Sequence, residues 1–301
     1  MEPPITVILN PRSGDQKGES TRQEIEALFR ANGRSVEISI TAKQELPKLA
    51  EQRARGDADI VVAAGGDGTV ACVAAALVGT GKTLGVLPLG SLNHFAKDLS
   101  IPLEVKEAVR NVVTGQSIQV DVGEVNGRVF LNNSSLGLYP LMVSDRQLQQ
   151  HRLGRGKWLA FLWATLHVLR RYPLLEVRIT VAGQKISRRT PSVFIGNNVY
   201  AIAGFDLGSR PTLQAGTLGL YVTRDTGRLG LFQFVARAVF GRLNQANDFT
   251  ALCAAEAWIE TRQRRLLVAT DGEVAPMSSP LHFRTRPGAL CVRVPHPPGS
   301  G

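Results

Sequence analysis

The sequence has 301 residues, of which 44% are hydrophobic and 20% are charged, as is ordinary for a folded protein. This length is sufficient for one large domain or for two domains with separate hydrophobic cores. The formal net charge of +10 predicts attraction to an anionic partner, which leaves nucleic acid, an anionic membrane surface and a phosphorylated substrate open. The arginines are scattered, without a basic arm or interleaved aromatic residues, so we expect no nucleic-acid partner.

The cysteine pattern and the absence of targeting signals indicate a cytoplasmic protein. Cys72, Cys253 and Cys291 lack the paired spacing of a zinc site, and an odd number does not suit a disulfide framework. Residues 1–4 lead directly into an apolar strand, so we expect no signal peptide. The longest apolar run, Trp158 to Leu169, is shorter than the ~20 residues that span a bilayer. The sequence therefore predicts a soluble or peripheral protein.

In the N-terminal part of the chain, apolar strands alternate with amphipathic helices. The expected strands are 5–9, 36–40, 60–64 and 83–87, and the expected helices are about 20–31, 44–55 and 70–78. This alternation predicts an α/β domain with a doubly wound parallel sheet over residues 1–121. Ligands of such sheets bind beyond the carboxyl ends of the strands, where three loops would meet: 10–14, 65–69 and 88–93.

After about residue 120 the pattern changes to short apolar strands separated by turn residues. The expected strands are 122–125, 129–132, 175–181, 192–195, 218–223, 257–260, 266–269 and 290–294, with hairpin turns at Asn126-Gly127 and Ala182-Gly183. This pattern predicts an antiparallel β-sandwich domain over residues 122–285, interrupted by helical insertions at about 157–171 and 229–243. Residues 286–301 would return to the first domain, with a disordered tail from Pro295.

The loop Gly65-Gly-Asp-Gly-Thr69 is the strongest candidate for a phosphate-binding site. It joins a buried strand to a helix, its glycines allow the backbone to approach a bulky anion, and Thr69 is expected to be the N-cap. Free N–H groups and the positive end of a helix favour phosphate oxygens. A turn in which the glycines serve geometry alone is the alternative. Asp67 argues against it, because a carboxylate beside phosphate needs a role such as holding Mg²⁺, ordering the loop or accepting a proton.

Two further segments carry polar groups after a strand. In Pro88-Leu-Gly-Ser-Leu-Asn93, Gly90 gives a ligand access to the backbone, Ser91 offers a hydroxyl, and Asn93 offers a side-chain donor or an N-cap. A turn with a structural role alone is the alternative. In Asp271-Gly-Glu273, one carboxylate could orient or hold a metal while the other accepts a proton from a hydroxyl nucleophile. The alternative is a common Asp-Gly hairpin turn.

Gly79-Thr-Gly-Lys-Thr83 has the appearance of the end of a P-loop. However, Ala76 stands where the first glycine of that motif would be, and the segment precedes a strand and does not link a strand to a helix. We therefore predict a plain turn.

Together these segments resemble the diacylglycerol kinase catalytic-domain family, which includes bacterial lipid kinases and the sphingosine and ceramide kinases. The resemblance covers nearly the whole chain and rests on motifs in this order: Asn10-Pro-Arg-Ser-Gly14, Gly65-Gly-Asp-Gly-Thr69, Pro88-Leu-Gly-Ser-Leu-Asn93, Val120-Asp-Val-Gly123 and Asp271-Gly-Glu273. NAD kinases and phosphofructokinases carry loops similar to the second motif. The third motif and the late Asp-Gly-Glu favour the lipid kinases.

The resemblance implies a phosphotransferase of lipid metabolism and phospholipid biosynthesis, which transfers the γ-phosphate of ATP to a diacylglycerol-like alcohol with Mg²⁺ as cofactor. It makes Glu273 the proton acceptor with Asp271 beside it, and Asp67 the residue that serves the Mg²⁺–nucleotide. The residues implied to bind ATP are Asn10, Pro11, Ser13, Gly14, Thr41, Gly65, Gly66, Asp67, Gly68, Thr69, Val70, Ala71, Gly90, Ser91 and Asn93.

The sequence departs from the family pattern at two places. The acidic turn that holds a structural Mg²⁺ in many bacterial members corresponds to Leu213-Gln-Ala-Gly216, which has no carboxylate, so we expect that site to be absent. In the third loop, the usual threonine and aspartate are Ser91 and His94.

Two other functions stay open: a soluble-substrate kinase related to the NAD kinases, and a non-catalytic nucleotide- or lipid-binding homologue. The helix around Trp158–Leu169 could bind the anionic inner face of a membrane or serve as a core helix, and both readings stay open. A homodimer stays open too.

Overall fold

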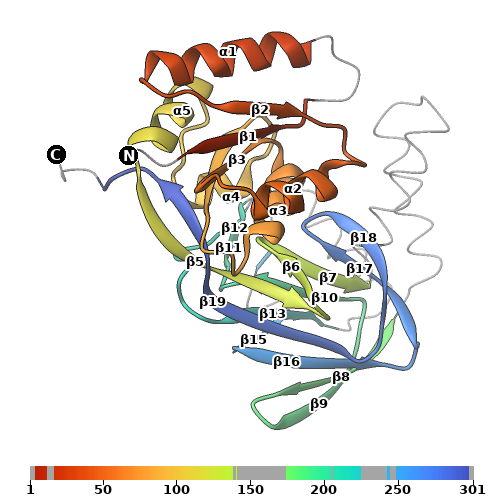
Figure 1. Ribbon diagram of the computed structural model, residues 1–301. Coiled ribbons are helices and arrows are strands. Elements are labelled where there is room, and N and C mark those ends of the chain that lie inside the picture. The colour runs from red at the N-terminus through yellow and green to blue at the C-terminus, as the bar shows by residue number, and fades with distance from the viewer. Residues whose placement is uncertain are drawn as a thin grey trace, which may run out of the picture. The chain divides into compact units, whose positions relative to one another are not determined.

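The computed structural model describes residues 4–11, 17–137, 140, 174–204, 206–224, 243–244 and 249–297. The chain forms two compact units, Met1–Val122 with Pro287–Gly301, and Gly123–Arg286, which we call the first unit and the second unit. The strands β5 (Gln116–Val125) and β19 (Leu281–Val294) run from one unit into the other (Figure 1). The helical insertion expected at 157–171, and that at 229–243 up to its last residue, lie outside the described residues.

The first unit is built around a parallel sheet. Its strands β1 (Ile5–Leu9), β2 (Glu37–Ile40), β3 (Ile60–Gly65) and β4 (Thr83–Pro88) lie in the order β2-β1-β3-β4, and the end of β19 pairs with β4 in parallel. Every residue of β1 and β3 is buried, because helices cover both faces of the sheet. This explains why these strands form continuous apolar runs in the sequence.

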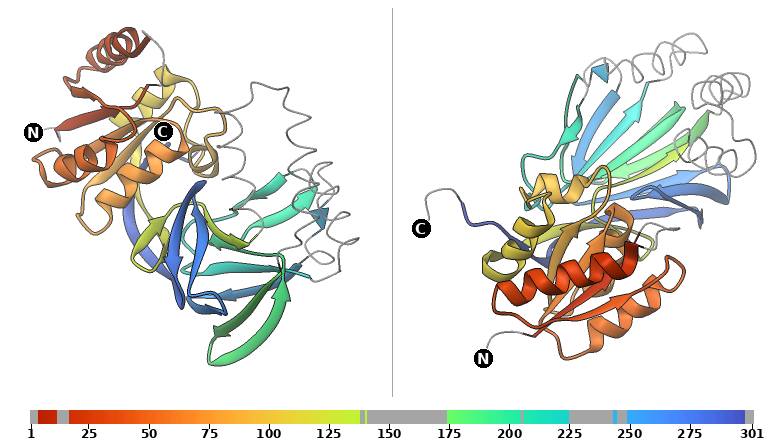
Figure 2. Two further views of the ribbon diagram at one scale, coloured as in Figure 1. Left: turned by 90° about the vertical axis from the view of Figure 1, so that its right-hand side faces the viewer. Right: turned by 90° about the horizontal axis from the view of Figure 1, so that it is seen from above.

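The helices of the first unit lie on the two faces of this sheet. They are α1 (Lys17–Ala31), α2 (Leu46–Arg55), α3 (Asp67–Leu77), the short α4 (His94–Asp98) and α5 (Val105–Thr114). Helix α1 packs beside α5 and α2 beside α3 (Figure 2). Phe29 of α1 and Val109 of α5 share a core with Val7 and Val62 of the sheet. The predicted doubly wound α/β domain is thus confirmed, and a helix follows the loop 88–93 as expected, whereas α5 was not predicted.

The second unit is a sandwich of antiparallel strands. One sheet has the order β19-β16-β8-β9, and β5 forms a hairpin with β6; the other sheet has the order β15-β13-β10-β7-β17-β18; and β12-β11-β14 form a small third sheet. The bounds are β6 (Arg128–Phe130), β7 (Asn133–Gly137), β8 (Leu175–Val181), β9 (Gln184–Thr190), β10 (Ser192–Asn197), β11 (Ala201–Gly204), β12 (Asp206–Ser209), β13 (Leu218–Thr223), β14 (Leu243–Asn244), β15 (Phe249–Ala254), β16 (Glu256–Thr261), β17 (Arg265–Thr270) and β18 (Glu273–Ser278).

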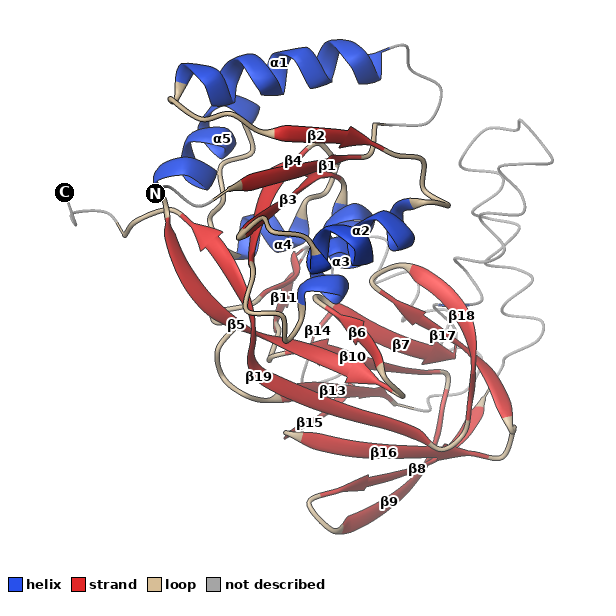
Figure 3. Cartoon of the chain, in the orientation of Figure 1, coloured by secondary structure: helices blue, strands red, loops and turns tan. Residues whose placement is uncertain are grey.

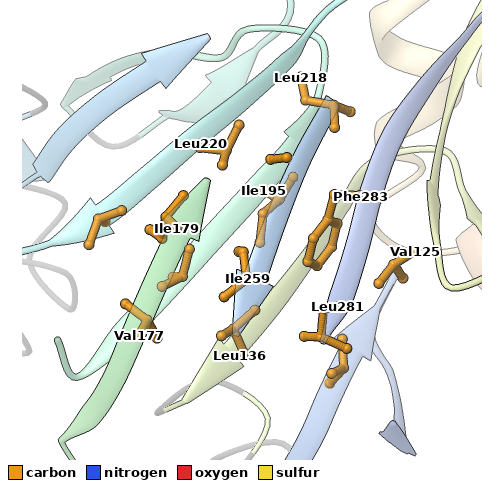
Figure 4. Close-up of a cluster of buried hydrophobic side chains, with 14 of the residues drawn as sticks. Val125, Leu136, Val177, Ile179, Ile195, Leu218, Leu220, Ile259, Leu281 and Phe283 are labelled. Carbon is orange, nitrogen blue, oxygen red and sulfur yellow. The ribbon is translucent and has the colours of Figure 1, made fainter. Parts of the chain in front are cut away.

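Apolar side chains from both large sheets of the second unit form its core. Ile179, Ile259 and Phe283 extend from the four-stranded side toward Ile195 and Leu220 of the six-stranded side (Figure 4). All of them are fully buried. The predicted antiparallel sandwich is confirmed, and the helices α1 to α5 all belong to the first unit (Figure 3).

Three two-residue hairpin turns of the second unit have the same backbone form. Asn126-Gly127 joins β5 to β6, Ala182-Gly183 joins β8 to β9, and Asp271-Gly272 joins β17 to β18. In each turn both residues have positive φ, at 48° followed by 78° to 83°. These values are typical of a type I′ turn, which fits the twist of paired strands. The first two turns were predicted. Asp271-Gly272 forms the Asp-Gly hairpin turn that was the structural alternative for this segment.

Hydrogen bonds tie the C-terminal segment to the end of α5. The guanidinium of Arg293 donates from Nε to the carbonyl oxygen of Val112 at 3.1 Å. Gln116 Nε2 donates to the carbonyl oxygen of Pro295 at 3.3 Å, and His296 Nε2 lies 2.9 Å from the carbonyl oxygen of Thr114. Pro295 and His296 therefore belong to the first unit.

Candidate functional site

Backbone hydrogen bonds bring the predicted site loops of the first unit together at the carboxyl edge of its sheet. The N–H group of Asn10 donates to the carbonyl oxygen of Ala64 at 2.9 Å. The N–H groups of Thr41 and Leu89 donate to the carbonyl oxygens of Leu9 and Gly65, each at 2.9 Å. The ends of four adjacent strands are thereby joined. Of the first loop, Ser13 and Gly14 lie outside the described residues.

Helix α3 begins inside the glycine loop. Gly66 is its N-cap, and the carbonyl oxygen of Gly66 accepts the N–H groups of Thr69 at 2.9 Å and Val70 at 3.1 Å. The prediction that Thr69 is the N-cap was wrong, because the helix starts at Asp67, three residues before the expected start at Val70. Thr69 is buried, and its side chain fills the space beside Gly65, where a Cβ atom would lie 2.5 Å from Thr69 Oγ1.

The start of α3 presents N–H groups that have no acceptor within the helix, together with the positive end of the helix dipole. Such a helix start attracts phosphate oxygens. Asp67 is the first helical residue and is partly exposed there. The negative charge of its carboxylate interacts favourably with the same N–H groups. When a phosphate occupies those groups, the carboxylate could bind the cation that accompanies the phosphate.

The third loop lies against the glycine loop without side chains between them. A Cβ atom on Gly90 would lie only 2.7 Å from Gly66 Cα. The buried side chain of Asn93 holds this loop closed: its Oδ1 accepts the N–H group of Gly90 at 3.1 Å, and its Nδ2 donates to the carbonyl oxygen of Gly90 at 3.0 Å. Asn93 is also the N-cap residue of α4, but its side chain makes no cap hydrogen bond.

These features fit a nucleotide phosphate and its magnesium ion. Ser91 is exposed in the third loop, and His94 is exposed at the first position of α4. In the described part of the chain, no three His, Cys, Asp or Glu side chains are close enough to hold a metal ion. An ion at Asp67 would therefore take its other ligands from phosphate and water, as Mg²⁺ commonly does.

In the second unit, Asp271 holds a turn of the neighbouring strands. Its Oδ2 accepts the N–H group of Leu131 at 2.7 Å, and its Oδ1 accepts those of Asn132 at 2.8 Å and Asn133 at 3.1 Å. Burial raises the pKa of this carboxyl, although the three N–H groups and the nearby Arg210 act in the opposite direction. The residue as a whole is partly exposed, because its backbone forms the tip of a hairpin. With both oxygens engaged, Asp271 is suited to positioning and not to proton transfer.

Glu273 is the first residue of β18 and has a different environment. Its side chain is 46% exposed, and its Oε2 lies 3.0 Å from Nη2 of Arg128, which is 36% exposed. An ion pair with this much exposure is worth only about 0–1 kcal/mol, so it holds the carboxylate weakly. Arg128 was not predicted, because no local pattern links it to a residue 145 positions away.

Two other predicted turns have structural roles. In Gly79–Thr83, Gly79 and Gly81 have φ of 78°, and Lys82 Nζ donates to the carbonyl oxygens of Gly56 at 2.6 Å and Ala58 at 2.5 Å. The segment lies at the amino end of β4, opposite the glycine loop, so the prediction of a plain turn is confirmed. In Leu213–Gly216, Leu213 is buried and the N–H group of Ala215 donates to Asn198 Oδ1 at 3.1 Å.

Comparisons with known proteins cover both units. Residues 4–125 match the model of the diacylglycerol kinase catalytic domain, and residues 142–294 that of the YegS C-terminal NAD kinase beta sandwich-like domain. The chain is 29% identical to the "Probable lipid kinase YegS-like" of Cronobacter sakazakii, over 96% of this chain and 95% of that protein. It is 26% identical to the "Probable lipid kinase YegS" of Salmonella heidelberg, over 97% and 96%.

The fold is shared with a solved structure. A diacylglycerol kinase from Bacillus anthracis superposes with a TM-score of 0.69 at 22% identity, over 97% of this chain and 96% of that one. Among the described residues, no helix is long and apolar enough to span a membrane.

Proposed function

Since the chain belongs to the lipid kinases that join a diacylglycerol kinase catalytic domain to a YegS-type β-sandwich domain, we propose that it transfers the γ-phosphate of ATP to a hydroxyl of a diacylglycerol-like lipid. The observation that carries this proposal is the close approach of two glycine loops at the start of α3, where no side chain separates Gly66 from Gly90 and the first N–H groups of the helix have no acceptor within it. Transfer of a phosphoryl group depends mainly on positioning and on charge stabilisation, which such a site can provide.

The first unit would bind the nucleotide. ATP would supply the phosphoryl group, and Mg²⁺ would neutralise its charge. The N–H groups at the start of α3 would hold the phosphate oxygens, and Asp67 would hold the ion. Asn10, Thr41 and Ser91, at the same edge of the sheet, would contact the rest of the nucleotide.

The second unit would bind the lipid, and Glu273 would orient the lipid hydroxyl and accept its proton. A glutamate carboxylate is a weak base toward an alcohol, so the proton would move late in the reaction. Asp271 would keep the hairpin tip in place through its three backbone hydrogen bonds. Arg128 would hold the Glu273 side chain near its working position until the hydroxyl arrives.

The net charge of +10 supports a further part of the proposal: a cytoplasmic enzyme of phospholipid synthesis meets its lipid at an anionic membrane face. Co-sedimentation with vesicles of phosphatidylcholine, with and without phosphatidylglycerol, tests this part. Equal binding to both vesicles, or binding to neither, would contradict it.

Transfer of labelled phosphate from ATP with Mg²⁺ tests the proposed reaction. The acceptor panel contains diacylglycerol, phosphatidylglycerol, sphingoid and isoprenoid alcohols, and NAD as the soluble alternative. We expect a labelled lipid, and about a 10²-fold or larger loss of kcat in Glu273→Gln and in Asp67→Ala. Glu260→Gln, another exposed glutamate of the second unit that pairs with an arginine, is the matched control. Labelled NAD alone, or ATP binding without any labelled lipid, would overturn the proposal.

A further inference from the structure

The turn at Leu131–Asn133 is held by a second buried charge besides Asp271. Arg210 is 4% exposed. Its Nη1 donates to the carbonyl oxygen of Leu131 at 2.6 Å and to that of Asn197 at 3.1 Å, and its Nη2 donates to Asn132 Oδ1 at 2.8 Å. Asp271 accepts hydrogen bonds from the N–H groups of this turn, and Arg210 donates hydrogen bonds to oxygen atoms of the same turn.

Neighbouring polar side chains complete the network around this turn. Tyr200 Oη donates to the carbonyl oxygen of Asn132 at 3.0 Å, and Asn197 Nδ2 donates to that of Leu131 at 2.9 Å. The guanidinium carbon of Arg210 lies 5.4 Å from the centre of the Tyr200 ring. A buried arginine is costly unless its donors are matched, and a matched network fixes its members in one arrangement.

The nearest member of the network, Asp271, is two positions from the proposed base, Glu273. Asp271 and Gly272 are the two turn residues, and Glu273 is the next residue, which pairs with Thr270 across the hairpin. A displacement of the Asp271 carboxylate would therefore move the backbone from which Glu273 projects. We infer that Arg210 is a positioning residue for Glu273, acting through the turn at Leu131–Asn133 and the Asp271 hairpin. This inference rests on the proposed function.

The geometry requires the fork of an arginine. Nη1 and Nη2 reach acceptors on two different residues of the turn, which a single ammonium group cannot reproduce. Arg210→Lys should therefore lose most of the positioning effect although it keeps the charge, and it also serves as the second variant if Arg210→Met does not fold.

A double-mutant cycle separates positioning from a general loss of folded protein. We expect Arg210→Met to lower kcat about tenfold or more with the KM for ATP unchanged, because a catalytic carboxylate displaced by a fraction of an ångström loses much of its effect. In a Glu273→Gln background the same change should have little further effect, since the group it positions is gone. Arg178→Met, at an exposed arginine of the same unit, is the control. Equal fold-losses in both backgrounds would overturn the inference.

Amide hydrogen exchange tests the network independently of activity. In Arg210→Met, the amides of 131–133 and 270–273 should exchange faster than in the wild type, while those of β3 in the first unit keep their rates. Unchanged exchange at 131–133 and 270–273 would overturn the inference. If the wild type labels no lipid, the proposed function fails, and the exchange rates still decide whether Arg210 holds the hairpin.

Discussion

A methyl group at Gly68 would test whether the glycine loop contacts phosphate, because the free protein has room for it. Gly68 is the second residue of α3 and is exposed, and a Cβ atom there would meet no atom within 4 Å. Its φ is not positive, so alanine fits the backbone without strain. Replacing glycine by alanine at such a position stabilises a protein by about 0.4–1 kcal/mol, because the unfolded chain loses freedom.

In the complex with a nucleotide, by contrast, the new methyl group at residue 68 should be unfavourable. A phosphate oxygen held by the first N–H groups of α3 would lie about 3 Å from the nitrogen atoms, in the space that the new methyl group would occupy. Loss of one hydrogen bond to a charged group costs about 1.5–3 kcal/mol. This corresponds to about a 10- to 100-fold weaker affinity for ATP, at 1.4 kcal/mol for each factor of ten.

Urea denaturation of the free protein and calorimetric titration with Mg²⁺–ATP measure the two effects in Gly68→Ala. Gly56→Ala is the matched control, because Gly56 is also exposed beside a helix end and its Cβ would lie no closer than 3.5 Å to another atom. It should bind ATP like the wild type. If Gly68→Ala is as stable as the wild type or more so and also binds ATP equally well, the glycine loop does not hold the phosphate.

Other substitutions test the packing and the charges of the two units. Gly90→Ala should destabilise the protein by about 1–3 kcal/mol, because its methyl group would lie 2.7 Å from Gly66 Cα; wild-type stability in urea would contradict this close approach. Asp271→Asn should cost about 1–3 kcal/mol, because an amide cannot accept all three N–H groups. Burial raises the pKa of Asp271 in the folded state, so its contribution is fully present below the unfolded pKa of about 3.9 and falls as pH rises through the folded pKa. The advantage of the wild type in thermal unfolding should therefore shrink from acidic to neutral pH, and an advantage that grows would show that the N–H groups outweigh burial. Arg128→Met should change stability by at most about 1 kcal/mol and lower kcat less than Glu273→Gln does; a thermal unfolding scan and initial rates measure both, and a larger loss of kcat in Arg128→Met would give Arg128 a direct role.

The sequence by itself determined many of the strands and several of the turns of this protein. Strands β1, β8 and β13 have the predicted bounds, since continuous or alternating apolar residues bury only in that conformation. The polar edge strand β9 was missed, because it buries few side chains and so leaves no apolar pattern. The turn Asn126-Gly127 was also predicted, because positive φ at two successive residues selects such pairs.

Only the tertiary structure decided which groups the polar side chains meet. Asp271 holds backbone groups 138 to 140 positions away, and Arg210 holds one 79 positions away, so neither role has a local signal. The N-cap of α3 fell on Gly66 and not on Thr69: β3 pairs with β4 as far as Gly65, and the helix begins two residues later, at Asp67. Neighbouring residues determine local sterics and burial periodicity, whereas hydrogen-bond partners that are distant in the sequence depend on which strands the fold places side by side.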